Sequence, residues 1–127
     1  TECPMALGVT ELKTEERPFV GCSFLRNQDW EEGKVEIIPY SDRRVAAAAV
    51  SAGTAVYKAL GIRDYGRLDF RVDNSGQLLF IEAATHPHIT PGSSFDIAAG
   101  LHGWSFSEMV RELISLAQYR YAQKNDA

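Results

Sequence analysis

The sequence predicts an α+β domain in which helices pack on an antiparallel sheet. Residues 67–73 alternate polar and apolar side chains, and turn-forming residues separate them from an apolar run at 78–83, which is typical of a β-hairpin. An alanine-rich stretch at 43–60 and an amphipathic stretch after Ser105 have the helical period. The expected order is therefore β-β-α-β-β-loop-α, with residues 1–127 forming a single domain.

The composition is that of a globular protein, with 45% hydrophobic and 24% charged residues in 127. The net charge of −4 argues against a nucleic-acid binder, which usually has a basic face. Cys3 and Cys22 form no C-x-x-C pair and indicate reduced thiols in a cytoplasmic protein. We find no apolar run of spanning length and no signal peptide, so we expect no membrane partner. Because the chain starts at Thr1, we expect a processed product or a fragment.

The N-terminal third has the weakest pattern. Residues 1–16 are mixed, whereas 19–25 have the composition of a strand that starts after Pro18. A second strand is expected at 34–38, where Pro39 stops it. These two strands are expected to pair antiparallel.

The first helix is predicted to run from Arg43 to Leu60. Ser41 or Asp42 supplies its N-cap, because their side-chain oxygens accept hydrogen bonds from the first turn. Gly61 is a stop signal directly after it.

The segment 85–103 is rich in proline, glycine and histidine and is expected to be mostly loop, with a short helical turn at 95–100. Ser105 and Glu108 then form a capping-box pattern before the last helix, whose tail at 123–127 should fray. The predicted apolar face of this helix consists of Phe106, Met109, Val110, Leu113, Ala117 and Tyr121.

A turn at 74–77 fixes the register expected for the hairpin. One face then carries the pairs Val72–Leu79, Phe70–Ile81 and Leu68–Ala83, and this apolar face should pack on a helix. The other face carries Arg71–Phe80, Asp69–Glu82 and Arg67–Ala84.

This register sets Asp69 directly opposite Glu82, with Cβ atoms about 4.5–5.5 Å apart. Two like charges there destabilise the hairpin unless a cation neutralises them. Arg67 and Arg71 flank Asp69 on the same face and do so in part, which leaves a solvated face of Arg–Asp pairs as one interpretation. Mg²⁺, which takes carboxylate ligands together with substrate phosphates, is the other.

The histidines offer a weaker metal hypothesis. His86 and His88 flank a proline and, with Glu82, contain the ligand types of a zinc hydrolase; two solvated loop histidines are the alternative. His102 is expected to be structural. Ser93-Ser94 follow a Pro-Gly pair and either present hydroxyl and N–H groups to an anion or simply form a turn.

Two runs together resemble a known family. Ala59 to Asp73 reads A-L-G-I-R-D-Y-G-R-L-D-F-R-V-D, and Leu78 to Phe95 reads L-L-F-I-E-A-A-T-H-P-H-I-T-P-G-S-S-F. They resemble the C-terminal part of the ATP-grasp ligases, nearest to the D-alanine–D-alanine ligases, whose runs read approximately A-L-G-x-x-G-x-x-R-x-D-F-x-x-D and E-x-N-x-x-P-G-x-T-x-x-S. The resemblance covers about residues 45–121 well and the first 40 only loosely.

The resemblance implies an ATP-dependent carboxylate–amine ligase that works through an acylphosphate, as in peptidoglycan biosynthesis. ATP and Mg²⁺ would be its cofactors, and amino-acid or dipeptide-like small molecules its substrates. By position, Asp69 and Glu82 would bind Mg²⁺, and Arg67 would stabilise the transferring phosphoryl group. Ile81 would pack on adenine, although the alternation turns it the other way unless a bulge intervenes. Ser93 would hold the second substrate's carboxylate.

Departures from the family pattern are equally informative. Ala84 replaces a metal-binding asparagine, and His88 replaces a glycine near the reacting centre. Between Tyr40 and Val45 there is no room for the family's long lysine-bearing loop, and Arg43-Arg44 are the only cations nearby. The N-terminal domain and the first half of the grasp are also absent from these residues.

Two functions therefore stand side by side. The first is the C-terminal part of a ligase, inactive as an isolated chain. The second is a degenerate, non-catalytic remnant that acts as a binding or interaction module. In both cases we expect self-association through an exposed sheet edge.

Overall fold

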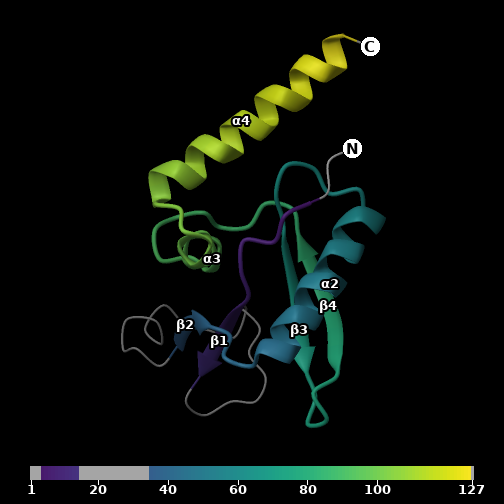
Figure 1. Ribbon diagram of the computed structural model, residues 1–127, viewed down its shortest axis with the longest axis vertical. Helices are drawn as coiled ribbons and strands as arrows, with labels where there is room; N and C mark the ends of the chain where they lie inside the picture. The colour runs from purple at the N-terminus through teal and green to yellow at the C-terminus, as the bar shows by residue number, and fades with distance from the viewer. Residues whose placement is uncertain (1–3, 15–34, 127) are drawn as a thin grey trace.

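The computed structural model describes residues 4–14 and 35–126, and every structural statement below refers to these residues. Within them the chain forms two separate two-stranded antiparallel sheets and three helices, an α+β arrangement (Figure 1). The fold class agrees with the prediction, although the strands form two sheets and not one. Cys3, Cys22 and the strand expected at 19–25 lie outside the described residues.

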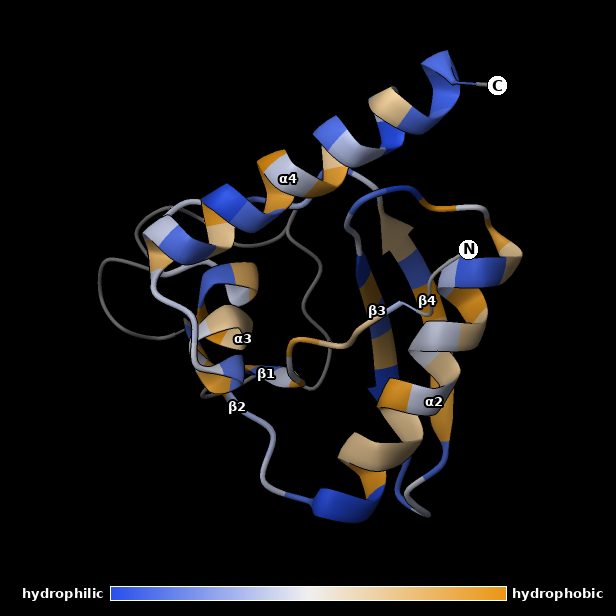
Figure 2. Ribbon diagram, turned by 45° about the horizontal axis from the view of Figure 1, so that its top comes forward, coloured by the Kyte–Doolittle hydropathy of each residue, from blue (hydrophilic) through white to orange (hydrophobic). Residues whose placement is uncertain are grey.

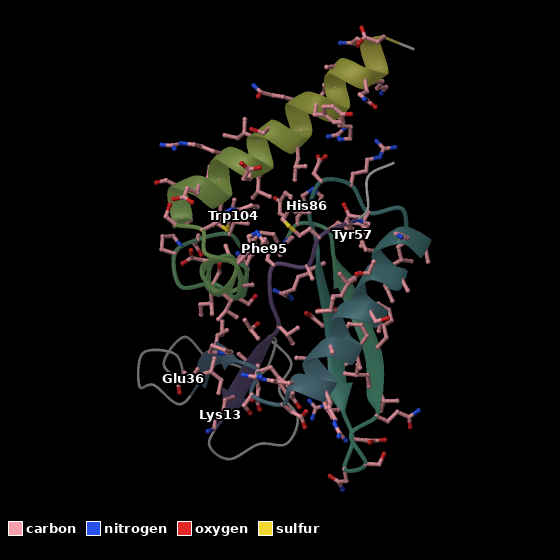
Figure 3. The ribbon with its side chains drawn as sticks, in the orientation of Figure 1. Lys13, Glu36, Tyr57, His86, Phe95 and Trp104 are labelled. Carbon is pink, nitrogen blue, oxygen red and sulfur yellow. The ribbon has the colours of Figure 1, made fainter. Side chains whose placement is uncertain are left out.

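The first sheet pairs β1 (Thr10–Thr14) with β2 (Val35–Pro39). The strand β1 was missed because T-E-L-K-T contains a single apolar residue. Its Lys13 lies opposite Glu36, and opposite charges in this arrangement favour the pairing (Figure 3). Pro39 ends β2 opposite Thr10, where it disturbs no ladder interior.

Helix α2 (Arg43–Ala59) begins as predicted and ends one residue before the predicted Leu60, which is its C-cap. Of the two candidate caps, Asp42 is the one used: its Oδ1 accepts hydrogen bonds from the backbone N–H of Arg44 at 3.0 Å and of Val45 at 3.2 Å. Gly61, just beyond the helix, has the positive φ of 65° that glycine adopts without strain. The helix lies along the hairpin (Figure 1), and none of its residues is buried.

The hairpin pairs β3 (Arg67–Val72) with β4 (Leu78–Ala84). At its base the register is as predicted, with the pairs Arg67–Ala84, Leu68–Ala83 and Asp69–Glu82. Near its tip the prediction is wrong by one residue, since the observed pairs are Phe70–Phe80, Arg71–Leu79 and Val72–Leu78. The register shifts between Asp69 and Phe70, so Ile81 is the extra residue of a β-bulge.

The turn explains this shift. Asp73 N–H donates to the carbonyl of Gln77 at 3.0 Å, which leaves residues 74–76 as the loop, one residue fewer than expected. The Asp73 carboxylate also accepts from Ser75 and Gln77 N–H at 2.9 Å each, and Gly76 has a φ of 85°. Such a loop with glycine in the left-handed region is a common hairpin turn. The bulge then restores the predicted register at the base.

One face of the hairpin packs on α2, but incompletely. Phe70 and Phe80 contact each other edge to face, with ring centroids 5.6 Å apart, and Phe70 faces Gly53 of α2. Leu79 and Ile81, which were expected on the packed face, are instead 51% and 53% exposed. The one-residue shift moves Leu79 opposite Arg71 and leaves Ile81 without a partner in the ladder.

The most buried part of the molecule lies between α3 (Ser94–His102) and α4 (Phe106–Asn125). Phe95, Ala99 and Met109 form its centre. Around them pack Leu7, Tyr65, Ile89, Trp104, Val110 and Leu113. Helix α3 is thus longer than the short turn that the sequence predicted. The ring of His102, an exposed residue, contacts that of Trp104 edge to face, with ring centroids 4.6 Å apart, and its structural role stays a prediction.

Helix α4 starts as predicted, with Ser105 Oγ accepting from Glu108 N–H at 3.2 Å. Two members of its predicted apolar face, Phe106 and Tyr121, are exposed. The tail does not fray at residue 123, because the helix continues to Asn125. Hydrophilic and hydrophobic residues alternate along α4, and its far end reaches beyond the other elements (Figure 2). None of the described helices is both long and apolar enough to cross a bilayer.

Candidate functional site

The two carboxylates singled out in the sequence meet across the hairpin. Asp69 of β3 and Glu82 of β4 are direct partners in the ladder, so their side chains leave the same face. Directly opposite residues have Cβ atoms about 4.5–5.5 Å apart. The pairing of Asp69 with Glu82 is the one expected from the sequence, while the role of the pair in binding a metal stays a prediction.

Arg67 lies beside this pair and aligns Asp69. Its Nε donates to Oδ1 at 2.8 Å and its Nη2 donates to Oδ2 at 2.9 Å, a bidentate contact between side chains that are about 30% exposed. Such contacts fix the plane of a carboxylate. Each Asp69 oxygen still has a lone pair to offer, because an ionised carboxylate has about four acceptor positions.

The donor set suits Mg²⁺ in kind but supplies few ligands. Asp69 and Glu82 offer the hard oxygens that this ion prefers. In the described part of the chain no three histidine, cysteine, aspartate or glutamate side chains converge on a common point. Ala84, two residues after Glu82, adds no oxygen. Further ligands would have to be phosphate oxygens and water, as is usual for Mg²⁺ at nucleotide sites.

Ile81 occupies the bulge next to Glu82, and its side chain is half exposed. Strict alternation along the strand predicted that Ile81 faces α2, which conflicts with a role in packing on adenine. The bulge at Ile81 interrupts the alternation and so removes this conflict. An exposed aliphatic side chain beside two carboxylates is available to a planar apolar group. Packing on adenine stays a prediction.

Ser93 lies on a different element from the other predicted site residues. It is the N-cap of α3, and its Oγ accepts from Asp96 N–H at 3.3 Å. Gly92 N–H donates to Asp96 Oδ2 at 2.8 Å, so the loop before the helix is held in place. Because Oγ acts as an acceptor here, its hydrogen remains to be donated to another group. The hairpin thus brings together Arg67, Asp69, Ile81 and Glu82, and Ser93 belongs to the α3 region.

The zinc hypothesis for Glu82, His86 and His88 is wrong. All three residues are described, and they form no metal-binding cluster. The proline between the histidines is buried, whereas both histidines are exposed. His86 Nδ1 instead lies 3.1 Å from Thr85 Oγ1.

The structure also contains a hollow that the sequence did not predict. It has a volume of about 530 Å³ and lies between the end of α2, the base of the hairpin and α4, and His86, labelled in Figure 3, is one of its lining residues. Its lining comprises residues 60–65, Ala83, Thr85, His86 and Arg120. It includes neither Asp69 nor Glu82.

The edge of this hollow carries an ion pair between Asp64 and Arg120, which are 56 residues apart. The hydrogen bonds from Arg120 to Asp64 raise the pKa of the guanidinium. Burial, and next the charge of Asp64, raises the pKa of the Tyr57 phenol. No pattern within one element reports a pair so distant in the chain, so sequence reasoning had no signal for it.

Comparison with known proteins agrees with the resemblance noted in the sequence. Residues 21–115 match a family model described as the D-ala D-ala ligase C-terminus. A D-alanine–D-alanine ligase of Synechococcus sp. is 33% identical over 75% of this chain and 30% of that protein. A D-alanine–D-alanine ligase of Maridesulfovibrio salexigens is 36% identical over 68% of this chain and 29% of that protein.

An uncharacterized protein, y4sG, of Sinorhizobium fredii is 30% identical over 63% of this chain and 24% of that protein. The chain therefore spans about a quarter to a third of the length of these curated relatives. The family model covers well over half of the chain. On this match, the chain belongs to the family of D-alanine–D-alanine ligase C-terminal domains.

Proposed function

We propose that the chain is the C-terminal ATP-grasp part of an ATP-dependent carboxylate–amine ligase of the D-alanine–D-alanine ligase type. The observation that carries this proposal is the opposition of Asp69 and Glu82 across the hairpin, with Arg67 held against Asp69. Membership of the family supports it independently.

Each residue then has a defined task. Asp69 and Glu82 hold Mg²⁺, and the Arg67 guanidinium offsets negative charge that develops on the transferring phosphoryl group. When bound, Mg-ATP would supply the phosphoryl group with which a substrate carboxylate would form an acylphosphate, and ADP would leave. Ile81 provides an apolar surface for adenine, and Ser93 donates its hydroxyl hydrogen to the carboxylate of the second substrate. The substrates are amino-acid or dipeptide-like, and the site of action is the cytoplasm.

The isolated 127 residues do not carry out this reaction by themselves. The curated relatives are three to four times longer than the segment they share with this chain. We expect ATP to be held between this part and another part of a longer protein. Calorimetry of the chain with Mg-ATP should therefore show no binding or only millimolar binding, and tight binding would contradict this expectation.

A second candidate is a non-catalytic remnant that serves as a binding module. Two residues favour it: Ala84 offers no metal ligand, and His88 adds a side chain where the family pattern has glycine. The natural-length protein should be assayed for ATP-dependent dipeptide formation. Clear turnover excludes the remnant, and its absence with intact metal binding favours it.

The metal site itself can be tested on the chain alone. Mn²⁺ replaces Mg²⁺ at oxygen sites and is followed by electron paramagnetic resonance. We expect weak binding that falls about tenfold or more in D69N and in E82Q, because each removes one of two charged ligands. E36Q, at an exposed acid of β2, is the matched control and should bind as the wild type does. If D69N and E82Q bind Mn²⁺ unchanged, the assignment fails.

Self-association is proposed through the edge of β4. Each described strand has only one partner among the described residues, and β4 carries the exposed apolar side chains Leu79 and Ile81. Unprotected edges of this kind pair with other chains. Light scattering after gel filtration should show concentration-dependent dimers that L79K reduces. A monomer at all concentrations would contradict the proposal.

A further inference from the structure

The loop between α2 and β3 contains a strained residue. Asp64 is the only described residue other than glycine with a positive φ, at 62°. Tyr65 N–H donates to the Arg63 carbonyl at 2.7 Å, which closes a three-residue turn around Asp64. A turn of this kind with positive φ is rare and strained for an L residue, whereas glycine adopts it freely. An aspartate at this position requires a contact that offsets the strain.

That contact is the ion pair with Arg120 of α4. Nε donates to Oδ1 at 2.9 Å and Nη2 donates to Oδ2 at 2.9 Å, so the guanidinium grips the carboxylate in a bidentate manner. The Asp64 side chain is only 17% exposed and that of Arg120 32%. Ile62 N–H donates to the Tyr57 carbonyl at 3.1 Å, so the start of this loop is held against the last turn of α2. Asp64 therefore lies where α2, α4 and the start of the hairpin meet.

The residues that follow Asp64 are fixed just as closely. The Tyr65 ring contacts Phe95 of the α3 core edge to face at 5.4 Å. At Gly66 a Cβ atom would lie 3.0 Å from Ile62 Cγ2 and 3.5 Å from the carbonyl oxygen of Ala84, so the backbone is pressed between the loop and the end of β4. The next residue is Arg67, and Asp69 follows two positions later. The strand that carries the candidate site thus starts from a loop held by both α3 and α4.

The C-terminal half of α4 contains no buried residue, and the Asp64–Arg120 ion pair connects this half to the α2–β3 loop. Met109, near its start, is its only buried residue, and Ile114, Leu116, Tyr119 and Tyr121 are exposed. Arg120 is three turns beyond Met109, on the face that returns to the rest of the molecule. A bidentate, partly buried ion pair is the type of contact that fixes orientation as well as distance.

We propose that Asp64 and Arg120 are positioning residues: their ion pair fixes the entry of β3 against α4 and thereby sets the orientation of Arg67, Asp69 and Glu82 relative to Ser93 on α3. The catalytic meaning of this positioning rests on the proposed function. The mechanical statement, that the pair orients the hairpin against the α3–α4 region, stands without it.

The experiment measures that orientation directly. Nitroxide labels are attached at Asn74→Cys on the hairpin turn and Gln118→Cys on α4, two exposed positions, in a chain that carries C3S and C22S. Pulsed electron–electron double resonance then measures the distribution of distances between the two labels. The distance distribution is compared in D64G, R120Q and R120K. The control is R111Q, the same change at an exposed arginine of the same helix.

We expect D64G and R120Q to widen the distance distribution at least twofold, R120K to widen it less, and R111Q to leave it unchanged. The thermal midpoints should not follow the same order. D64G removes the strain together with the ion pair, so its midpoint should fall less than that of R120Q although both widen the distribution equally. A role in stability alone predicts lower midpoints with an unchanged distribution. That result, or distributions in D64G and R120Q as narrow as in R111Q, overturns the proposal.

Mn²⁺ titration of the same variants separates this proposal from the proposed function. The ion pair orients the hairpin as a unit, so D64G and R120Q should retain the Mn²⁺ affinity of the wild type. If the distance distributions of D64G and R120Q widen but the wild type binds no Mn²⁺, the metal site is refuted and the positioning role stands. If the wild type binds Mn²⁺ but the distributions of D64G and R120Q are unchanged, the positioning role is refuted and the metal site stands.

Discussion

The hairpin with α2 and the pair α3–α4 are built on different physical principles. The buried residues Phe95, Ala98, Ala99 and Met109 all lie in α3 and α4, and the only other buried hydrophobic residue among those described is Ile62 in a loop. Neither α2 nor the hairpin strands contain a buried residue. The candidate metal site, Asp69 and Glu82, lies on the hairpin. The proposed metal binding is therefore located where burial is least.

This difference shows what keeps the candidate site in shape. A ladder of backbone hydrogen bonds, the turn at Asp73 and the Phe70–Phe80 contact define the hairpin locally. Its orientation, in contrast, depends on the loop that leads into it from α2. Regions with few buried contacts open locally at lower free-energy cost than packed ones. The following four tests, from the largest expected effect to the smallest, ask whether the two regions differ in this way.

The largest effect is expected in the α3–α4 core. Met109 is fully buried, so M109A should lower the free energy of unfolding by about 2–5 kcal/mol, as for other large-to-small changes in a core. I114A, at a 54% exposed position of the same helix, should change it by less than about 0.5 kcal/mol. Urea denaturation measures both. Equal effects of the two variants would mean that Met109 is not central to a core.

Two glycines sharpen the contrast. At Gly8 a Cβ would lie 3.1 Å from Leu101 Cδ1 and 3.3 Å from the Ala98 carbonyl oxygen, so G8A should destabilise the chain by about 1 kcal/mol. At Gly53 in α2 an added Cβ would lie 4.0 Å from Phe70 Cε2, which is an ordinary van der Waals contact. G53A should therefore stabilise the chain by about 0.5–1 kcal/mol, because alanine favours the helix interior. Thermal unfolding of both variants checks the opposite signs.

The third test concerns the two opposed carboxylates. Without divalent ions, E82Q should raise the free energy of unfolding by about 0.2–1 kcal/mol, because it removes a like charge opposite Asp69. With Mg²⁺ at a concentration equal to its Kd, the wild type should gain about 0.4 kcal/mol and E82Q nothing. Denaturation with EDTA and with Mg²⁺ measures the two differences. A gain for E82Q equal to that of the wild type would show that Mg²⁺ binds elsewhere.

The smallest effect is expected at the hairpin turn. The hydrogen bond from Ser75 Oγ, followed by the one from Gln77 N–H, lowers the pKa of the Asp73 carboxyl below its ordinary 3.8. Because the folded state holds the ionised form, the stability from this carboxylate is fully present above pH 3.8 and is lost as the pH falls through the lowered pKa. The thermal midpoint of D73N should therefore fall less steeply below pH 4 than that of the wild type. Parallel pH profiles would contradict this.

The sequence was most informative where local pattern decides structure. The helix at Arg43–Ala59, the cap at Ser105 and the base of the hairpin, including the opposition of Asp69 and Glu82, could all be predicted from spacing and capping chemistry. Such features depend on neighbours within a few residues.

Features that depend on distant contacts or on single hydrogen bonds could not be predicted. The Asp73–Gln77 bond shortens the turn by one residue, and strict alternation does not predict the bulge that follows. The family resemblance was the signal for that bulge, because it gave Ile81 a role that conflicts with the alternation. The Asp64–Arg120 pair joins a loop to a helix 56 residues away. The strand at Thr10–Thr14 lacks the apolar alternation of a strand that packs on a core.

The bulge at Ile81 also makes the length of the chain at this point adjustable. Removing Ile81 would leave every flanking pair of the ladder with its present partner, since Phe80 would still face Phe70 and Glu82 would still face Asp69. The backbone pairing alone therefore does not require this residue. A variant that lacks it should fold, and what it then fails to bind identifies the task of the side chain.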